Sequence, residues 1–288
     1  MQMPHFNHPY HVALDLGTAW TRAANLEGRR SAVRTERRGR PGVRAGAVAD
    51  TSTCTEILQD LFRTLRPSFS SFTRRLSVIA PVSPRATDEE KQALTGTLYR
   101  SGAWGVVLIP QPLAAAIGAG LDPGSDYAQM IVDVGDGFTE YSVIRSGKVI
   151  ASEAVKVGCG TIRSAISAHC REHSARESTE ILLWLEKHSL RQAEDGGPLP
   201  AGLSQELLDS LGGSLGFLAE GSFQLFRRLP AKVATEVIES GITLVGGGAL
   251  LREMQLRMAD RTGLAVRVPR NPLTAVIEGA AQVIPYAS

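Results

Sequence analysis

The chain has 288 residues, a length that predicts about two domains or two lobes of one unit. Its 43% hydrophobic and 21% charged residues are ordinary for a globular protein and argue against a disordered or fibrous chain. The formal net charge is only +2, from 31 basic and 29 acidic residues. That surplus is too small to indicate a protein dedicated to nucleic-acid binding.

The three cysteines, Cys54, Cys159 and Cys170, have no paired spacing, which argues against a disulfide framework or a zinc knuckle. A reducing compartment is therefore expected. The first residues lack a basic region followed by an apolar run, and no long apolar stretch occurs elsewhere. We expect a cytoplasmic protein without a signal peptide or a membrane span.

The first half alternates expected strands with expected helices, as in an α/β protein. A capping box of Thr87 and Glu90 marks the start of the second helix, which should end at Gly102. The apolar patterns predict strands at 11–16, 76–80 and 106–109 and a first helix at 55–65.

An arginine-rich segment spans residues 29–44, with seven arginines and one glutamate. Glycine and proline interrupt any hydrophobic period there, so we expect a solvated loop. A contact with phospholipid or nucleic acid is the alternative.

The second half begins after a turn-like composition at 121–126, so a second lobe should start near Asp122. A Gly/Pro loop is expected at 195–202, with helical patterning after it to about Leu229. The remaining pattern predicts strands at 130–134, 138–144, 242–245 and 264–268 and helices from Gly248 to Met258 and at 273–283.

Each half contains an Asp-x-Gly turn directly after an apolar strand, at Asp15-Leu-Gly-Thr and at Asp133-Val-Gly-Asp-Gly. Glycine leaves backbone N–H groups accessible, and such groups can surround phosphate oxygens. The adjacent carboxylates, Asp15 and Asp133, are candidates to face a hydrated Mg²⁺. A single turn of this kind is weak evidence, because Asp and Gly are common in hairpins for structural reasons.

A third glycine-rich turn, Gly246 to Gly248, follows the strand at 242–245. It could place adenosine or its phosphates at a helix start. A ligand-free connection between strand and helix is equally consistent with the sequence. The two Asp-x-Gly turns and this third turn together are much stronger evidence than any one of them.

Five motifs resemble those of the actin superfamily, and most of all the bacterial MreB and Mbl actins that organise cell-wall synthesis. They are DLGTAWTR (15–22), IPQPLAAAIGAG (109–120), VDVGDGFTE (132–140), GITLVGGGALL (241–251) and NPLTAVIEGAA (271–281). The resemblance implies an α/β, actin-like ATPase fold with two RNase H-like lobes around a nucleotide cleft and reduced outer subdomains. Lobe I would be 1–121 completed by 270–288, and lobe II would be 122–269.

The same resemblance implies a site for ATP and Mg²⁺. Gln111 would orient the attacking water, Glu186 would contact the ribose or adenine, and Asp15, Asp133 and Asp136 would hold the metal through water. The remaining nucleotide contacts would come from Gly17, Thr18, Thr21, Arg22, Gly135, Gly137, Thr139, Gly246, Gly247 and Gly248. An exposed strand arginine is the alternative for Arg22. Trp184, which replaces a lysine of the family near the adenine, is interpreted as core packing.

Other departures concern the metal and the outer subdomains. Gln111 and Asp136 resemble eukaryotic actin, whereas Gly160 and Arg163 stand where the family tends to place two aspartates. The chain is also shorter than the family's members, in segments 22–41 and 188–215. We therefore expect weak nucleotide retention and impaired polymerisation.

The resemblance implies a cytoskeletal protein for cell shape or cell-wall synthesis, including spore-wall synthesis, with slow ATPase activity. Its partners would be further copies, MreB-like filaments and wall-synthesis or morphogenetic proteins, with no nucleic acid and only peripheral contact with the inner face of the membrane. One alternative is a non-hydrolysing adaptor that binds full-length MreB-like filaments. A sugar or acid kinase is a weaker alternative, because no positioned general base is evident.

Overall fold

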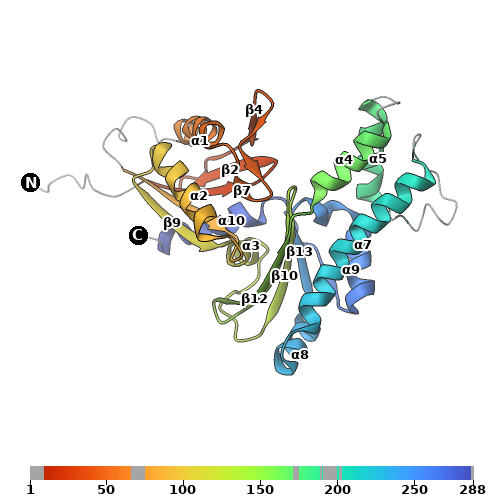
Figure 1. Ribbon diagram of the computed structural model, residues 1–288. Helices are drawn as coiled ribbons and strands as arrows, with labels where there is room; N and C mark the ends of the chain where they lie inside the picture. The colour runs from red at the N-terminus through yellow and green to blue at the C-terminus, as the bar shows by residue number, and fades with distance from the viewer. Residues whose placement is uncertain are drawn as a thin grey trace, which may run out of the picture. The chain divides into compact units, whose positions relative to one another are not determined.

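The computed structural model describes residues 10–65, 75–170, 175–188, 190, 200 and 203–286. The chain forms two compact units. Unit 1 comprises residues 1–122 and 274–288, and unit 2 comprises residues 123–273. Figure 1 shows their helices and strands, with labels on many of them.

Unit 1 is built on a five-stranded sheet of order β3-β2-β1-β8-β9. β1, β2 and β3 are antiparallel neighbours, whereas β8 and β9 continue the sheet in parallel. The strands are β1 (Tyr10–Leu16), β2 (Trp20–Asn25), β3 (Arg30–Arg34), β8 (Leu76–Val82) and β9 (Gly105–Pro110). Two short hairpins follow β3: β4 (Glu36–Arg37) with β5 (Arg40–Pro41), and β6 (Val43–Arg44) with β7 (Ala47–Val48).

Unit 2 repeats this topology in a sheet of order β12-β11-β10-β13-β14. Its first three strands are again antiparallel neighbours, and the last two are again parallel additions. The strands are β10 (Gln129–Val134), β11 (Thr139–Arg145), β12 (Lys148–Val155), β13 (Ile242–Val245) and β14 (Val266–Arg267). The approximate duplication expected from the two Asp-x-Gly turns is therefore confirmed in the strand order.

Helices cover both faces of the unit 1 sheet. Alternate residues of β1, such as Val12 and Leu14, join the core beneath α1 and α2, while Ala13 between them is buried outside that cluster. α10 packs against β1, β2 and β8 and also against α3. The helices are α1 (Thr51–Leu65), α2 (Asp88–Arg100), α3 (Gln111–Gly118) and α10 (Ala275–Val283), followed by the 3₁₀ turn η3 (Ile284–Tyr286).

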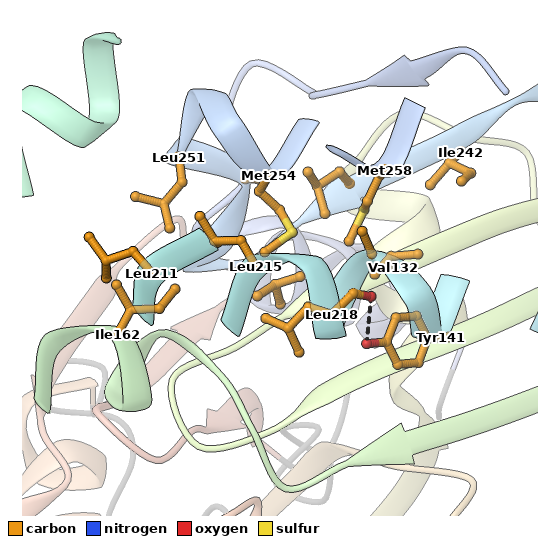
Figure 2. Packing of buried hydrophobic residues seen from close by; sticks show 14 of the residues in the cluster. Val132, Tyr141, Ile162, Leu211, Leu215, Leu218, Ile242, Leu251, Met254 and Met258 are labelled. Atoms are coloured by element: carbon orange, nitrogen blue, oxygen red, sulfur yellow. Dashed lines mark hydrogen bonds between the residues drawn. The ribbon is translucent and has the colours of Figure 1, made fainter. Parts of the chain in front are cut away.

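The core of unit 2 lies between its sheet and a layer of helices. Figure 2 shows Leu215 and Leu218 of α7 gathered with Met254 and Met258 of α9, and the Tyr141 hydroxyl of β11 donating to the Leu218 carbonyl over 2.9 Å. The helices are α4 (Cys159–His169), α5 (Ala175–Lys187), α7 (Gln205–Arg227), α8 (Ala231–Ser240) and α9 (Arg252–Thr262), with the 3₁₀ turn η2 (Gly247–Leu250) before α9.

Most expected elements of the first half are confirmed with modest shifts of their ends. The capping box is present, because the Thr87 side chain accepts from the Glu90 N–H while the Glu90 side chain accepts from the Thr87 N–H. α1 begins four residues before the expected Thr55, since the Asp50 carboxylate accepts the Thr53 N–H over 2.6 Å.

The expectation of a solvated loop over 29–44 is wrong. β3 pairs with β2 along residues 30–34, and its residues alternate between exposed and partly buried, with Val33 packed against the core. Pairing with β2 places alternate residues of β3 on opposite faces of the sheet. The arginines on its exposed face made this alternation difficult to recognise from hydrophobicity.

In the second half, β14 is shorter than the expected strand at 264–268, whereas β13 matches its prediction. The loop expected at 195–202 lies, apart from Pro200, outside the described residues. Among the described helices, none combines the length and the apolar character that crossing a membrane requires.

Candidate functional site

The first Asp-x-Gly turn joins β1 to β2 in a tight hairpin. The Gly17 N–H donates to the Trp20 carbonyl over 3.1 Å. A Cβ at Gly17 would lie 2.9 Å from that carbonyl oxygen, which is closer than a carbon atom can approach without displacing the turn. Glycine is therefore required at this position by space.

Two threonine hydroxyls support this turn from inside the protein. The Thr35 hydroxyl donates to the Gly17 carbonyl over 2.7 Å, and Thr21, which is fully buried, lies 2.9 Å from the same hydroxyl. Because Thr35 uses its one proton on Gly17, Thr21 must be the donor in their contact. The Thr21 hydroxyl is thus already bonded within the protein, which speaks against the phosphate contact that the resemblance implied.

Thr18 lies in the turn itself, where its hydroxyl accepts the Gly46 N–H over 3.3 Å.

Asp15 and Arg22 stand directly opposite each other on β1 and β2. Arg22 Nη1 lies 3.3 Å from Asp15 Oδ2, and both side chains are mostly shielded from solvent. Asp15 is therefore a neutralised carboxylate. Arg22 lies on a strand but is only partly exposed, so the alternative of an exposed strand arginine is not confirmed.

The second hairpin, between β10 and β11, has the same construction. The Gly135 N–H donates to the Phe138 carbonyl over 3.0 Å, and Gly137 completes the turn. Thr139 is fully buried and donates to the Val157 carbonyl over 2.8 Å. This hydroxyl, like that of Thr21, is bonded within the protein.

Helix α4 begins against this second turn. The N–H groups of Cys159 and Gly160 donate to the carbonyls of Gly135 and Asp136 over 2.9 and 2.8 Å. A Cβ at Gly158 would lie 2.5 Å from the Gly135 oxygen, so the close approach depends on glycine. The first turn of α4 therefore fixes the backbone of the hairpin loop.

Asp136, expected to help hold a metal, forms an ion pair with Arg163 on the second turn of α4. Its neighbour Asp133 stands directly across the strand pair from Glu140, whose side chain is almost completely buried. Burial, with smaller contributions from the carboxylates of Asp136 and Asp133 and against the opposing effect of Arg163, raises the pKa of the Cys159 thiol to about 12. The loop is thus a region of negative potential in which Arg163 supplies the compensating charge.

The third glycine motif lies beside the second hairpin. Gly246 has φ +81°, and a Cβ there would lie 2.4 Å from Asp133 Oδ1. A Cβ at Gly248 would meet the Val134 side chain at 2.3 Å, and Gly247 lies close to the Cys159 sulfur. The tertiary structure therefore brings the 246–248 turn against Asp133, more than a hundred residues away in sequence.

The other candidates lie elsewhere in their units. Gln111 is the first residue of α3, partly buried and flanked by Pro110 and Pro112. Glu186 is an exposed residue of α5. Trp184 packs against the unit 2 core and stacks on His188 with ring centroids 5.0 Å apart, which confirms its interpretation as core packing.

Two of the three carboxylates expected to face the metal, those of Asp15 and Asp136, fit a divalent cation poorly. Asp15 and Asp136 each form an ion pair with an arginine, and an arginine repels a metal ion that approaches the carboxylate it neutralises. Within the described part of the chain, no cluster of three or more His, Cys, Asp or Glu residues is arranged to hold a metal.

Sequence reasoning missed Thr35, which braces the first turn, and Glu140, which faces Asp133. Glu140 could have been found by counting outward from the second turn, because residues equidistant from a hairpin turn stand opposite each other. Thr35 carries no comparable signal, since its contact depends on the path of the chain after β3.

Comparison with known proteins agrees with this architecture. The family model described as MreB/Mbl protein matches residues 21–176 and 202–287. The cell shape-determining protein MreB of Escherichia coli (strain K12) is 30% identical over 257 residues, covering 83% of this chain and 74% of that protein.

Among solved structures, MreB 5 of Spiroplasma citri bound to AMPPNP superposes with a TM-score of 0.79 at 21% identity, covering 96% of both chains. The MamK double helical filament gives a TM-score of 0.74 at 14% identity, covering 96% of this chain and 99% of that one. These likenesses show the actin-like ATPase fold. With the family match and the E. coli relative, they establish that this chain belongs to the MreB/Mbl family of cell shape-determining bacterial actin homologues.

Proposed function

We propose that this chain binds ATP through its two hairpin turns and the 246–248 turn. The observation that carries the proposal is the identical construction of the two hairpins, one in each of two units with the same strand order. In each, an N–H···O bond closes a glycine turn that follows a strand carrying an aspartate. Turns of this kind present N–H groups suited to phosphate oxygens. A relative of the same fold, MreB 5 of S. citri, is bound to AMPPNP.

The N–H groups of Gly17 and Gly135 already close their turns, so these two glycines contribute by lacking a side chain that would obstruct the phosphates. The phosphate contacts come from the other turn residues, Thr18 and Gly137, and from Arg22. Thr21 and Thr139 hold the adjacent strands, because their hydroxyls are bonded to Thr35 and to the Val157 carbonyl. Gly246 and Gly248 allow the third turn to pack on β10, and Gly247 lies between them. Glu186 remains the candidate contact for the ribose or adenine.

Gln111 is the proposed water-orienting residue. Its position at the start of α3, between two prolines, restricts the local backbone. An amide orients water by hydrogen bonding but is a weak base, so hydrolysis is expected to be slow. No step is assigned to Mg²⁺, because the arginine partners of Asp15 and Asp136 do not fit a metal site.

At the level of the cell, we propose a cytoskeletal role in shape or cell-wall synthesis, spore-wall synthesis included. The family of the chain and the filament formed by MamK support self-association or binding to MreB-like filaments. Wall-synthesis proteins and a peripheral position at the inner face of the membrane belong to the same proposal. Weak assembly is expected, because the chain is shorter than the family's members in segments 22–41 and 188–215.

Equilibrium binding of fluorescently labelled ATP to the purified chain tests the proposal. Gly17→Ala places a Cβ 2.9 Å from the Trp20 carbonyl and should weaken binding by about tenfold or more. Gly105→Ala is the matched control in the same unit, because its Cβ makes only ordinary contacts at 3.6 Å or more. Loss of binding in both variants, or in neither, contradicts the assignment of the first hairpin.

Measurements of phosphate release and of sedimentation test the proposed hydrolysis and the proposed weak assembly, respectively. Gln111→Ala should abolish phosphate release while leaving labelled-ATP binding intact, and unchanged release would remove Gln111 from this role. Robust pelleting that depends on ATP would contradict weak assembly. If the chain binds no ATP but sediments together with MreB filaments, the adaptor function replaces the one proposed.

A further inference from the structure

The second hairpin carries a positive side chain where a metal was expected. Arg163 and Asp136 form an ion pair, with the Arg163 side chain 44% and the Asp136 side chain 19% exposed. A guanidinium has five N–H donors, and one carboxylate cannot use them all. The Arg163 side chain can therefore retain its ion pair with Asp136 and also donate a hydrogen bond to a phosphate oxygen.

The backbone around this pair holds Arg163 close to the turn. α4 is bonded to the hairpin through the Cys159 and Gly160 N–H groups, and Arg163 follows three residues later. The carboxylates of Asp133 and Asp136 at this hairpin oppose the approach of a polyanion such as ATP. A cation must offset them, and Arg163 is a cation fixed at this turn by the protein itself.

We propose that the Arg163 guanidinium takes the charge-compensating place of a divalent cation at the second hairpin, so that the chain binds ATP with little dependence on Mg²⁺. This inference rests on the proposed ATP binding and specifies how that site compensates phosphate charge. Arg22 provides the equivalent pairing for Asp15 at the first hairpin. Because both arginines are covalently part of the chain, removal of divalent cations does not remove their charge.

The test is the dissociation constant of labelled ATP measured in Mg²⁺ and again in excess EDTA. The wild-type chain should bind with constants that agree within about threefold in the two buffers. Arg163→Ala should weaken binding in EDTA by about tenfold or more, because a charge-assisted contact is lost. Mg²⁺ should restore much of that loss, since Asp136 is then freed from its partner.

Arg228→Ala is the matched control. Arg228 pairs with Glu153 over 3.1 Å at an exposed position near the end of α7, and it lies outside all three turns. This variant loses the same charge and should keep wild-type binding in both buffers. Thermal unfolding by circular dichroism verifies that each variant is folded, and the ATP-induced rise in melting temperature in EDTA gives a second readout.

The possible failures are distinguishable. Wild-type binding that weakens more than about tenfold in EDTA overturns the role of Arg163 and leaves ATP binding intact. Equal behaviour of Arg163→Ala and Arg228→Ala overturns it as well. Absence of ATP binding in both buffers refutes the proposed function and this inference with it.

Discussion

The crossing of α3 and α10 in unit 1 allows a quantitative test of the packing. Gly118 and Gly279 face each other's helices so closely that no side chain fits. A Cβ at Gly279 would lie 1.8 Å from the Ala114 carbonyl oxygen, and a Cβ at Gly118 would lie 1.8 Å from the Ala275 carbonyl oxygen. The backbones of the two helices therefore touch.

Gly279→Ala should destabilise unit 1. Carbon and oxygen atoms approach to about 3.3 Å at closest, so the helices must separate by roughly 1.5 Å. Overpacking of this kind costs about 1–3 kcal/mol, and the upper end applies here because the obstacle is backbone. The better helix propensity of alanine offsets at most about 1 kcal/mol. The expected net loss is about 2 kcal/mol.

Urea unfolding followed by circular dichroism measures this loss. The control is Gly96→Ala in α2, where the nearest atoms to a new Cβ are the Arg100 guanidinium nitrogens at 3.9 Å. This control should be neutral or should stabilise unit 1 by up to about 1 kcal/mol. Equal unfolding midpoints for the two variants would refute the contact between the α3 and α10 backbones.

Three further predictions concern single interactions. Tyr141→Phe should cost about 1 kcal/mol of unfolding free energy in a urea titration, because it removes the buried hydrogen bond to the Leu218 carbonyl, and an unchanged midpoint would exclude that bond. Thr87→Ala should cost about 1 kcal/mol by the same assay through loss of the capping box, whereas Thr87→Ser should retain most of it. Burial, with a contribution from the Asp50 carboxylate, raises the pKa of Cys54 to about 12, so its contribution to stability is complete below the pKa of the unfolded thiol and is lost as the pH rises towards 12. Stability should therefore fall more steeply above about pH 9 in the wild type than in Cys54→Ser, by up to about 1.4 kcal/mol per pH unit, and parallel curves would contradict this.

Local patterns predicted much of the fold. The apolar runs that became β1, β8, β10 and β13 are bounded by turn residues, and the Thr87 capping box lies within four residues of sequence. The strand in the arginine-rich segment is not evident from the sequence, because β3 is an edge strand whose exposed residues include Arg30 and Arg34. Its strand character depends on pairing with β2 rather than on hydrophobicity.

The sequence by itself determined the two hairpin turns and the third glycine turn, because glycine, aspartate and an adjoining apolar strand specify such turns within a few residues. Only the tertiary structure decided what each side chain does there. Packing of α4 on the hairpin pairs Asp136 with Arg163, and the return of the chain after β3 brings Thr35 under Gly17. Such contacts join residues that are far apart in sequence, and their partners are chosen by how helices and strands pack rather than by local conformational preference.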